Sequence, residues 1–272
     1  MNRVLSLALC LSCVVLIFGS SSGALAFGGK CLALAQNLQR DSDARIQYAN
    51  FQHLKEDEVE ITFVGHSTFR IVSPSGVNIA TDYAGWAGNG PPPDVVTMNH
   101  AHESHYTDYV DDRIAHVLKG WNDKGPGPVE HDLEVGDVWI RNVTTDIRLG
   151  AGFREKDGNS IFIFETANLC IGHLGHLHHE LAPPTLGWIG YLDVVMVPVD
   201  GTFTMDVKAM ARVMKDIRAR LILPMHYFGT SSLEEFLTEM GQSFDIEVTK
   251  FPSVIVSERS LPKKPKILVL SN

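Results

Sequence analysis

The stretch Asp94-Val95-Val96-Thr97-Met98-Asn99-His100-Ala101-His102-Glu103-Ser104-His105 places three histidines directly behind a short apolar run. Residues 94–97 predict a buried strand, and a short helix is expected after His105. Side chains at i and i+2 of an extended segment point the same way, so His100 and His102 can approach one ion together. Ser104 and His105 then turn the chain and bring a third imidazole to the same place. Because strand ends followed by loops are where α/β sheets build their sites, this stretch predicts a metal site.

Histidines gather in a second segment as well. The chain carries 12 histidines; three lie in residues 100–105 and four in residues 173–179. Neutral imidazole is the commonest ligand for zinc and related cations, so this density favours metal binding. His53, His116, His131 and His179 are interpreted as ordinary surface or core residues.

Outside these segments, strands dominate the first half of the chain, and strands alternate with helices in the second. Strand-like segments lie at 59–64, 68–72, 77–80, 138–143, 161–164, 169–171, 192–197 and 221–226. Apolar residues at helical spacing predict a helix over 207–217. The capping box Ser231-Ser232-Leu233-Glu234 predicts a second helix that ends at Gly241. The pattern favours one mixed α/β domain over residues 56–272 with sheets at its centre.

The first 26 residues have the layout of a secretory signal peptide. Arg3 supplies a positive charge, Val4 to Gly19 is almost wholly apolar, and Ala24-Leu25-Ala26 supplies small residues for cleavage. The apolar run, about 16 residues, is short for a membrane span, and no other segment could form one. We therefore expect cleavage after Ala26, a periplasmic or secreted protein, and no membrane association after cleavage. Residues 27–55 are polar and irregular and are expected to form an N-terminal arm.

The net charge of the chain indicates which partners it can bind, and its cysteines indicate whether it can form a disulfide. The net charge of −9 argues against binding to nucleic acid or to anionic membranes, so we expect a small-molecule substrate or ligand. Cys31 and Cys170 remain after cleavage of the signal. In an oxidising compartment they can pair, but the apolar run around Cys170 favours a buried free thiol.

Six short motifs then follow one another along the chain. They are Gly65-His66-Ser67-Thr68-Phe69, Thr81-Asp82, His100-x-His102-x-Ser104-His105, His173-Leu174-Gly175-His176, Val197-Pro198-Val199-Asp200-Gly201 and Pro224-Met225-His226-Tyr227. Their order resembles that of the metallo-β-lactamase-fold hydrolases, in particular the branch that contains the ascorbate-6-phosphate lactonase. The resemblance implies a four-layer αββα sandwich of the α/β (α+β) class, with a metal centre on one edge of the sheets.

Three of the family's ligand positions are changed in this chain. Ser104 stands where the family motif HxHxDH has aspartate, and His176 replaces the aspartate of HLGD that bridges two metals. Thr145-Asp146 stands where the branch has a histidine–aspartate pair. The resemblance carries metal-ligand roles over to the histidines that match, which are His100, His102, His105 and His226.

These changes predict one divalent metal per chain, with zinc the expected ion. At an effective dielectric constant near 20, two divalent cations about 3.5 Å apart repel by roughly 19 kcal/mol, and both aspartates that offset this repulsion in the family are missing. Two ligand triads stay open: His100, His102 and His176, or His105, His176 and His226. The expected outer-shell residues are Asp82 and Asp146, which would orient an imidazole, and Ser104, which has a helix-capping alternative. A structural hydrogen bond is expected for His173, and His178 is a candidate replacement ligand.

Three functional interpretations follow. The first is an exported metal-dependent hydrolase that uses a metal-bound hydroxide on an ester, lactone or phosphodiester. The second is a non-catalytic metal- or ligand-binding protein on the same fold, which the loss of both aspartates favours. The third, a scaffold without metal, is disfavoured because a scaffold has no reason to concentrate imidazoles at strand ends.

Overall fold

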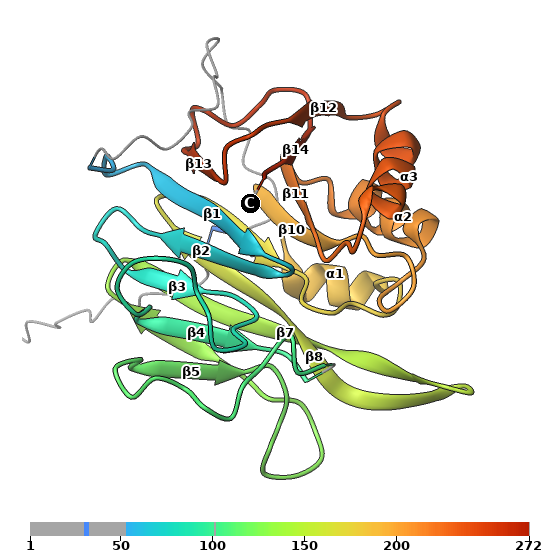
Figure 1. The fold of residues 1–272 in the computed structure, drawn as a ribbon, viewed down its shortest axis with the longest axis horizontal. Coiled ribbons are helices and arrows are strands. Elements are labelled where there is room, and N and C mark those ends of the chain that lie inside the picture. Colours follow the sequence, from blue (N-terminus) through green and yellow to red (C-terminus); the bar gives the residue numbers. More distant parts are fainter. Residues whose placement is uncertain (1–29, 33–52, 101, 272) are drawn as a thin grey trace, which may run out of the picture.

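The computed structural model describes residues 30–32, 53–100 and 102–271. The predicted signal peptide and nearly all of the predicted N-terminal arm lie outside these residues and stay predictions. Two stacked β-sheets form the centre of the described part, and helices lie against one of them (Figure 1). No helix in the described ranges has the length and apolar character needed to cross a membrane.

The first sheet has six strands in the order β13-β1-β2-β3-β4-β5. Its strands are β1 (Val59–Gly65), β2 (Thr68–Val72), β3 (Asn78–Ala80), β4 (Val95–Met98), β5 (His116–Lys119) and β13 (Ser253–Val256). The predicted strand at 68–72 is confirmed residue for residue. β3, β4 and β5 run parallel to one another.

The second sheet has eight strands in the order β12-β14-β11-β10-β9-β8-β7-β6. Its strands are β6 (Asp132–Val135), β7 (Val138–Gly150), β8 (Phe153–Thr166), β9 (Leu169–His173), β10 (Val194–Pro198), β11 (Leu221–Met225), β12 (Asp245–Val248) and β14 (Lys266–Val269). The five strands from β9 to β12 in this order are parallel. β7 and β8 form an antiparallel hairpin that extends well beyond the predicted strands 138–143 and 161–164.

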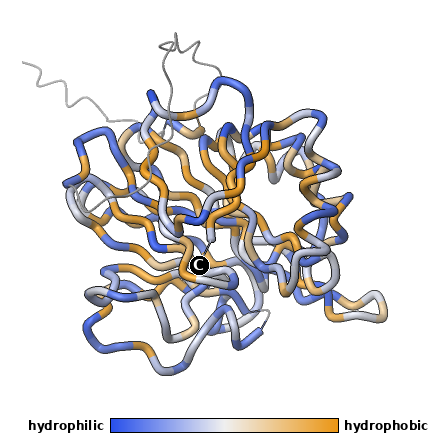
Figure 2. The backbone as a smooth tube through the Cα atoms, turned by 45° about the horizontal axis from the view of Figure 1, so that its top comes forward, coloured by the Kyte–Doolittle hydropathy of each residue, from blue (hydrophilic) through white to orange (hydrophobic). Residues whose placement is uncertain are grey.

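Alternating side chains of the second sheet fill two separate hydrophobic layers. On β10, Val194 and Met196 pack against the first sheet, whereas Val195 and Val197 pack against the helices. Both faces of this strand are buried, which explains its continuous apolar sequence. Figure 2 shows the same arrangement as hydrophobic central strands and hydrophilic turns at the surface.

Three helices cover the outer face of the second sheet: α1 (Pro183–Ile189), α2 (Val207–Ile217) and α3 (Thr230–Met240). The prediction of a helix over 207–217 is confirmed, and the side chain of Asp206 caps it by accepting from the N–H of Ala209. The proposed capping box at Ser231 is wrong: α3 begins at Thr230 behind Gly229 and has no side-chain cap. The helix expected after His105 is also absent, because residues 103–115 form turns and irregular loops.

The fold class, an α+β sandwich built on two sheets, is confirmed. In the described residues the outer face of the first sheet is covered by loops rather than by helices. Tyr83 and Ala87 from one loop and Ile114 from another pack there against Val96 and Met98 of β4. These loops, and not a rigid helix, therefore border the edge where β3 and β4 end.

A disulfide joins Cys31 to Cys170 on β9, so the expectation of a buried free thiol is wrong. Both cysteines are buried, and the backbone of Cys31 accepts a hydrogen bond from the N–H of Tyr191 at 2.8 Å. Lys30 adds a bond from Nζ to the carbonyl oxygen of Asn168 at 2.7 Å. The apolar surroundings of Cys170 are real, but they also enclose the partner cysteine, which the local sequence does not reveal.

The carboxyl ends of parallel strands from both sheets meet at one edge of the sandwich. β3 and β4 of the first sheet end there, and so do β9, β10 and β11 of the second. The loops that follow these strands carry most of the histidines, so the topology itself assembles the candidate site.

Candidate metal centre

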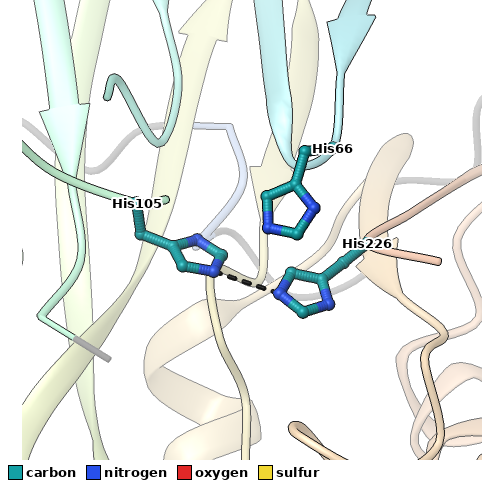
Figure 3. Close-up of side chains that lie close together, drawn as sticks. All are labelled: His66, His105 and His226. Carbon is teal, nitrogen blue, oxygen red and sulfur yellow. Dashed lines mark hydrogen bonds between the residues drawn. The ribbon is translucent and has the colours of Figure 1, made fainter. Parts of the chain in front are cut away.

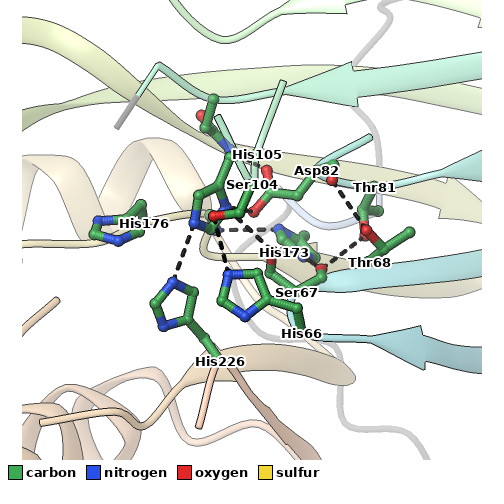
Figure 4. A network of polar contacts seen from close by, with 12 residues as sticks. His66, Ser67, Thr68, Thr81, Asp82, Ser104, His105, His173, His176 and His226 are labelled. Atoms are coloured by element: carbon green, nitrogen blue, oxygen red, sulfur yellow. Dashed lines mark hydrogen bonds and ion pairs between the residues drawn. The ribbon is translucent and has the colours of Figure 1, made fainter. Parts of the chain in front are cut away.

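Five imidazoles from four loops gather at this edge: His66, His102, His105, His176 and His226. Figure 4 shows four of them, His66, His105, His176 and His226. The ring of His176 lies 4.8 Å from those of both His105 and His226, and 4.7 Å from that of His102. The ring of His66 lies 4.2 Å from that of His226. His66, His105 and His226 also each offer one nitrogen within 4.8 Å of the others (Figure 3).

The backbone of the site is held in left-handed conformations. His66, Asp82 and His226 have φ values of 52°, 44° and 54°, a region that costs a non-glycine residue about 1–2 kcal/mol. The N–H of His226 donates to the carbonyl oxygen of His66 at 2.7 Å, which ties the turn after β1 to the loop after β11. Strained residues of this kind cluster at functional sites, where the surrounding fold over-determines them.

Asp82 orients His105 from behind. Nδ1 of His105 donates to Oδ2 of Asp82 at 2.8 Å, and both side chains are fully buried. The amide of Asn99 donates to the other oxygen, Oδ1, at 2.7 Å. Burial alone raises the pKa of Asp82, but His105, His173 and Asn99 outweigh it and hold the pKa below its ordinary value. Asp82 is therefore a carboxylate that fixes one imidazole.

Asp200 faces His226 in a similar position, through an ion-pair contact rather than a well-aligned hydrogen bond. Nδ1 of His226 lies 3.2 Å from Oδ1 of Asp200, and the backbone N–H groups of Thr202, Phe203 and Thr204 donate to this carboxylate. Burial opposes ionisation, but His226 and the Thr204 hydroxyl hold the pKa of Asp200 well below its ordinary value. Asp200 belongs to one of the six sequence motifs, but the sequence alone predicts no role for it in the site. The sequence feature that indicates a site residue here is the position of Asp200 just after the buried strand β10.

The two carboxylates determine which nitrogens of His105 and His226 are free. A carboxylate only accepts hydrogen bonds, so each Nδ1 carries the ring proton and each Nε2 presents a lone pair when the ring is neutral. These two Nε2 atoms lie 3.1 Å apart. Facing lone pairs repel unless a cation or a proton lies between them. Two nitrogen ligands of one tetrahedral zinc ion lie roughly 3.3 Å apart, so the pair fits a shared metal.

His176 repeats this arrangement with an imidazole in place of the carboxylate. Its Nδ1 lies 2.6 Å from Nε2 of His178, and donation from Nδ1 leaves a lone pair on its own Nε2. That Nε2 is buried and has no hydrogen-bond partner among the described residues. Burial, followed by the neighbouring imidazoles, lowers the pKa of His176 strongly, so the ring is neutral. An orphaned buried nitrogen beside the facing pair fits a further metal ligand.

His66 is a site residue that sequence reasoning missed. The motif that contains His66 predicts no ligand role for it, because His66 stands alone between two strands, 39 residues before His105. Burial lowers its pKa to about 4, followed by the effect of His226 and His105, so the ring is neutral at pH 7. Ser104 lies 3.2 Å from Nε2 of His66 through its hydroxyl and caps no helix.

Two of the predicted site residues lie elsewhere. His100 stacks on Trp121, with ring centroids 4.8 Å apart, and its Nδ1 bonds Glu155 at 2.9 Å. The triad of His100, His102 and His176 is therefore not assembled, since the strand ends before His100 and the i, i+2 rule fails in the turn. Asp146 accepts from the N–H of Asp157 on the long hairpin rather than from a clustered imidazole.

Of the other histidines in the second segment, His173 has a structural role and His178 contacts His176. Nε2 of His173 donates to the carbonyl oxygen of Ser67 at 2.8 Å, and its Nδ1 accepts from the N–H of Gly175. Both ring nitrogens are thus satisfied, as expected for a structural hydrogen bond. His178 orients His176, and its pKa is lowered to about 4, first by burial and then by Arg148.

Comparison with known proteins places this geometry among relatives. A family model described as the β-lactamase superfamily domain matches residues 60–226. A UPF0173 metal-dependent hydrolase of Koribacter versatilis is 26% identical over 227 residues, which cover 66% of this chain and 91% of the relative. Another, from Thermococcus onnurineus, is 24% identical and covers 71% and 96%.

Solved structures show the same architecture. A protein of Thermotoga maritima, described as a zinc-dependent hydrolase of the metallo-β-lactamase superfamily, is 28% identical with a TM-score of 0.56, over 78% of this chain and 98% of that one. A protein of Parabacteroides distasonis described as a metal-dependent hydrolase has a TM-score of 0.55 at 15% identity, over 68% and 89%, and shows the fold alone.

Proposed function

Since this chain belongs to the β-lactamase superfamily, we propose that it is a metal-dependent hydrolase whose reaction centre is the imidazole cluster at the sheet edge. The substrate classes are those with a bond that water can cleave at a carbonyl or phosphoryl group: an ester, a lactone or a phosphodiester. The observation that carries the proposal is the 3.1 Å approach of two Nε2 atoms, each held by a carboxylate behind its own ring.

Imidazole nitrogens favour zinc, and we propose one ion per chain, held by four of the five clustered rings, His66, His105, His176 and His226, or by three of these four. The absence of a carboxylate from this donor set supports a single ion, because nothing in it offsets the repulsion of a second. A bound divalent cation lowers the pKa of a water molecule and polarises the carbonyl or phosphoryl oxygen of a substrate.

The surrounding residues prepare the ligands for this role. Asp82 accepts the Nδ1 proton of His105, and Asp200 lies beside Nδ1 of His226, so both carboxylates favour an Nε2 lone pair directed at the same point. Their negative charge also makes the Nε2 atoms of the two rings stronger electron-pair donors to a metal ion. Asn99 in turn fixes Asp82, and it also accepts a hydrogen bond from the N–H of Ser160 on β8.

A second candidate is a binding protein without turnover. The observation that favours it is the number of imidazoles: four nitrogen ligands complete a tetrahedral site, and closed sites of this kind are structural. The hydrolase requires that one position stay open to water, which means that one of the four rings is not a ligand.

The experiment is metal analysis combined with hydrolysis assays on generic esters, lactones and phosphodiesters. The wild-type chain is compared with His226→Ala and with His116→Ala on β5, a matched loss of one imidazole away from the cluster. We expect one zinc per chain and turnover in wild type and His116→Ala, and loss of both in His226→Ala. Metal without turnover of any substrate would establish the binding protein. Turnover that survives His226→Ala would exclude the hydrolase centre described above.

We also propose that the protein is exported and acts on a small molecule. The signal-like residues 1–26 support export, and so does the Cys31–Cys170 disulfide, since such bonds persist in oxidising compartments. Amino-terminal sequencing of protein from the periplasmic or secreted fraction should begin at Phe27. A chain that starts at Met1 in the cytosolic fraction would contradict the proposal.

A further inference from the structure

An open cleft of about 410 Å³ lies directly against the imidazole cluster. Its lining residues are Val64, Gly65, His66, Thr68, Ala84, Trp86, Ser104 and Phe228. His66 and Ser104 form the side nearest the cluster, and Trp86 and Phe228 form the aromatic walls. A cleft lined mainly by apolar side chains and a few polar groups is the usual form of a small-molecule site.

Three large aromatic side chains around the cluster are exposed to solvent. Trp86 is 61% exposed, Phe228 68% and Phe203 53%. The ring of Phe228 lies 5.4 Å from that of His66 and 5.5 Å from that of Phe203, and Phe203 lies 5.8 Å from His102. Phe203 and Phe228 thus adjoin each other beside the imidazoles, and Trp86 lines the cleft. Exposed apolar surface gathered at one place marks a binding site, because leaving it in water is unfavourable.

The cleft offers no cationic side chain to an anion. None of its lining residues is a lysine or an arginine. Two arginines of the strands, Arg70 on β2 and Arg148 on β7, are already engaged: Arg70 donates to the carbonyl oxygens of Asn89 and Pro91, and Arg148 donates to that of Thr202. Asp200 and the net charge of −9 add a negative field near the site. A substrate group that lies in the cleft, away from the proposed metal, is therefore expected to be uncharged.

From these observations we infer that the substrate is an uncharged carboxylic ester or lactone whose apolar acyl portion lies in the cleft between Trp86 and Phe228. This inference rests on the proposed function, and it commits to a carbonyl substrate rather than to a phosphodiester. In the reaction, the oxygen of water bonds to the acyl carbon and the acyl–oxygen bond breaks. The leaving oxygen takes a proton from that water. Trp86 and Phe228 set specificity, and they contact the acyl group away from the reacting bond.

The test is a series of p-nitrophenyl esters, acetate, butyrate and hexanoate, beside bis(p-nitrophenyl) phosphate, on the metal-loaded full chain. Each methylene buried in the cleft is worth about fourfold in kcat/KM, so the two extra methylenes of butyrate should give a rise of roughly 15-fold over acetate. Trp86→Ala and Phe228→Ala should flatten this rise without changing metal content. Trp188→Ala serves as the control, because Trp188 is 70% exposed on α1 and lines no part of the cleft.

A binding measurement separates this inference from the proposed function. We expect 2-octanone, an uncharged ketone that cannot be hydrolysed, to change tryptophan fluorescence saturably in the wild type and not in Trp86→Phe or Phe228→Ala. Ketone binding with no ester turnover would remove the hydrolase and keep the apolar cleft. Turnover that is independent of acyl length, or faster on the phosphodiester than on every ester, would overturn the inference and keep the hydrolase. Ketone binding that Phe228→Ala leaves unchanged would also overturn it.

Discussion

Nε2 of His105 and Nε2 of His226 lie 3.1 Å apart although 121 residues separate them in the chain. His105 follows β4 of the first sheet, and His226 follows β11 of the second, so their approach depends on the stacking of the two sheets. The carboxylates of Asp82 and Asp200 determine that these nitrogens are the free ones. Metal affinity should therefore respond to residues that never touch the metal.

Asp82→Asn should weaken metal binding by about 10- to 100-fold without removing a ligand. An asparagine can present an N–H group to Nδ1 of His105, which favours the tautomer with its proton on Nε2 and its lone pair directed away from the site. Competition with a chromophoric chelator measures the affinity. Asp137→Asn is the matched control, since Asp137 bonds Ser73 and Ser75 on the far side of the first sheet. Unchanged affinity in Asp82→Asn would contradict the role assigned to this carboxylate.

His100→Ala should leave metal content at one ion per chain, whereas His105→Ala should abolish tight binding. His100 stacks on Trp121 and bonds Glu155 outside the cluster, and His105 lies at its centre. Both histidines belong to the same six-residue stretch, 100–105. The two variants therefore test whether metal binding depends on the position of a histidine in space rather than on its position in the sequence. Metal analysis after dialysis gives the stoichiometry. Loss of metal in His100→Ala would mean that its ring turns into the site when metal binds.

Gly175→Ala should lower the free energy of unfolding by about 1–3 kcal/mol. A Cβ atom there would lie 2.4 Å from both Asn99 Nδ2 and Asn159 Oδ1, and the φ of +57° disfavours any side chain. The displaced Asn99 would also release Asp82, so metal affinity should fall with stability. Urea denaturation measures the first effect. Gly187→Ala on α1, where a Cβ meets nothing within 4 Å, should be neutral or stabilising.

Reduction of the Cys31–Cys170 disulfide should lower the free energy of unfolding by about 2–4 kcal/mol. The bond closes a loop between residues 139 positions apart, and its loss frees the unfolded chain. Thermal melting with and without reductant measures the effect, and Cys31→Ser should melt like the reduced wild type. If reductant lowers the melting temperature of Cys31→Ser further, the disulfide is not the source of the change.

Local patterns in the sequence predicted local structure well. The strand at 68–72 and the helix over 207–217 depend on alternation and helical spacing within a few residues, and both have the predicted bounds. The capping box at Ser231 failed because the helix begins at Thr230, with Gly229 at the N-cap position, two residues before Ser231. Short edge strands such as β12 carry too few apolar residues to be recognised without their neighbours.

The site was predictable only in part, because it depends on which loops the two sheets bring together. Imidazoles at strand ends were recognised from their spacing, yet spacing could not decide between His100 and His105. His66 belongs to the cluster because the turn after β1 lies beside the end of β11, a relation fixed by the stacking of the sheets and by the bond from His226 to its carbonyl oxygen. Asp200 is recognised as a site residue only from its contact with His226 in the folded structure.

The covalent link between residues 31 and 170 also sets an order of events during biosynthesis. Cys31 is made early, but its partner is added only after more than half of the 272 residues have been translated. Cys31 must therefore remain an unpaired thiol until β9 has been synthesised and an oxidant can form the bond. Maturation of this protein depends on when that thiol meets its partner as well as on the final contacts.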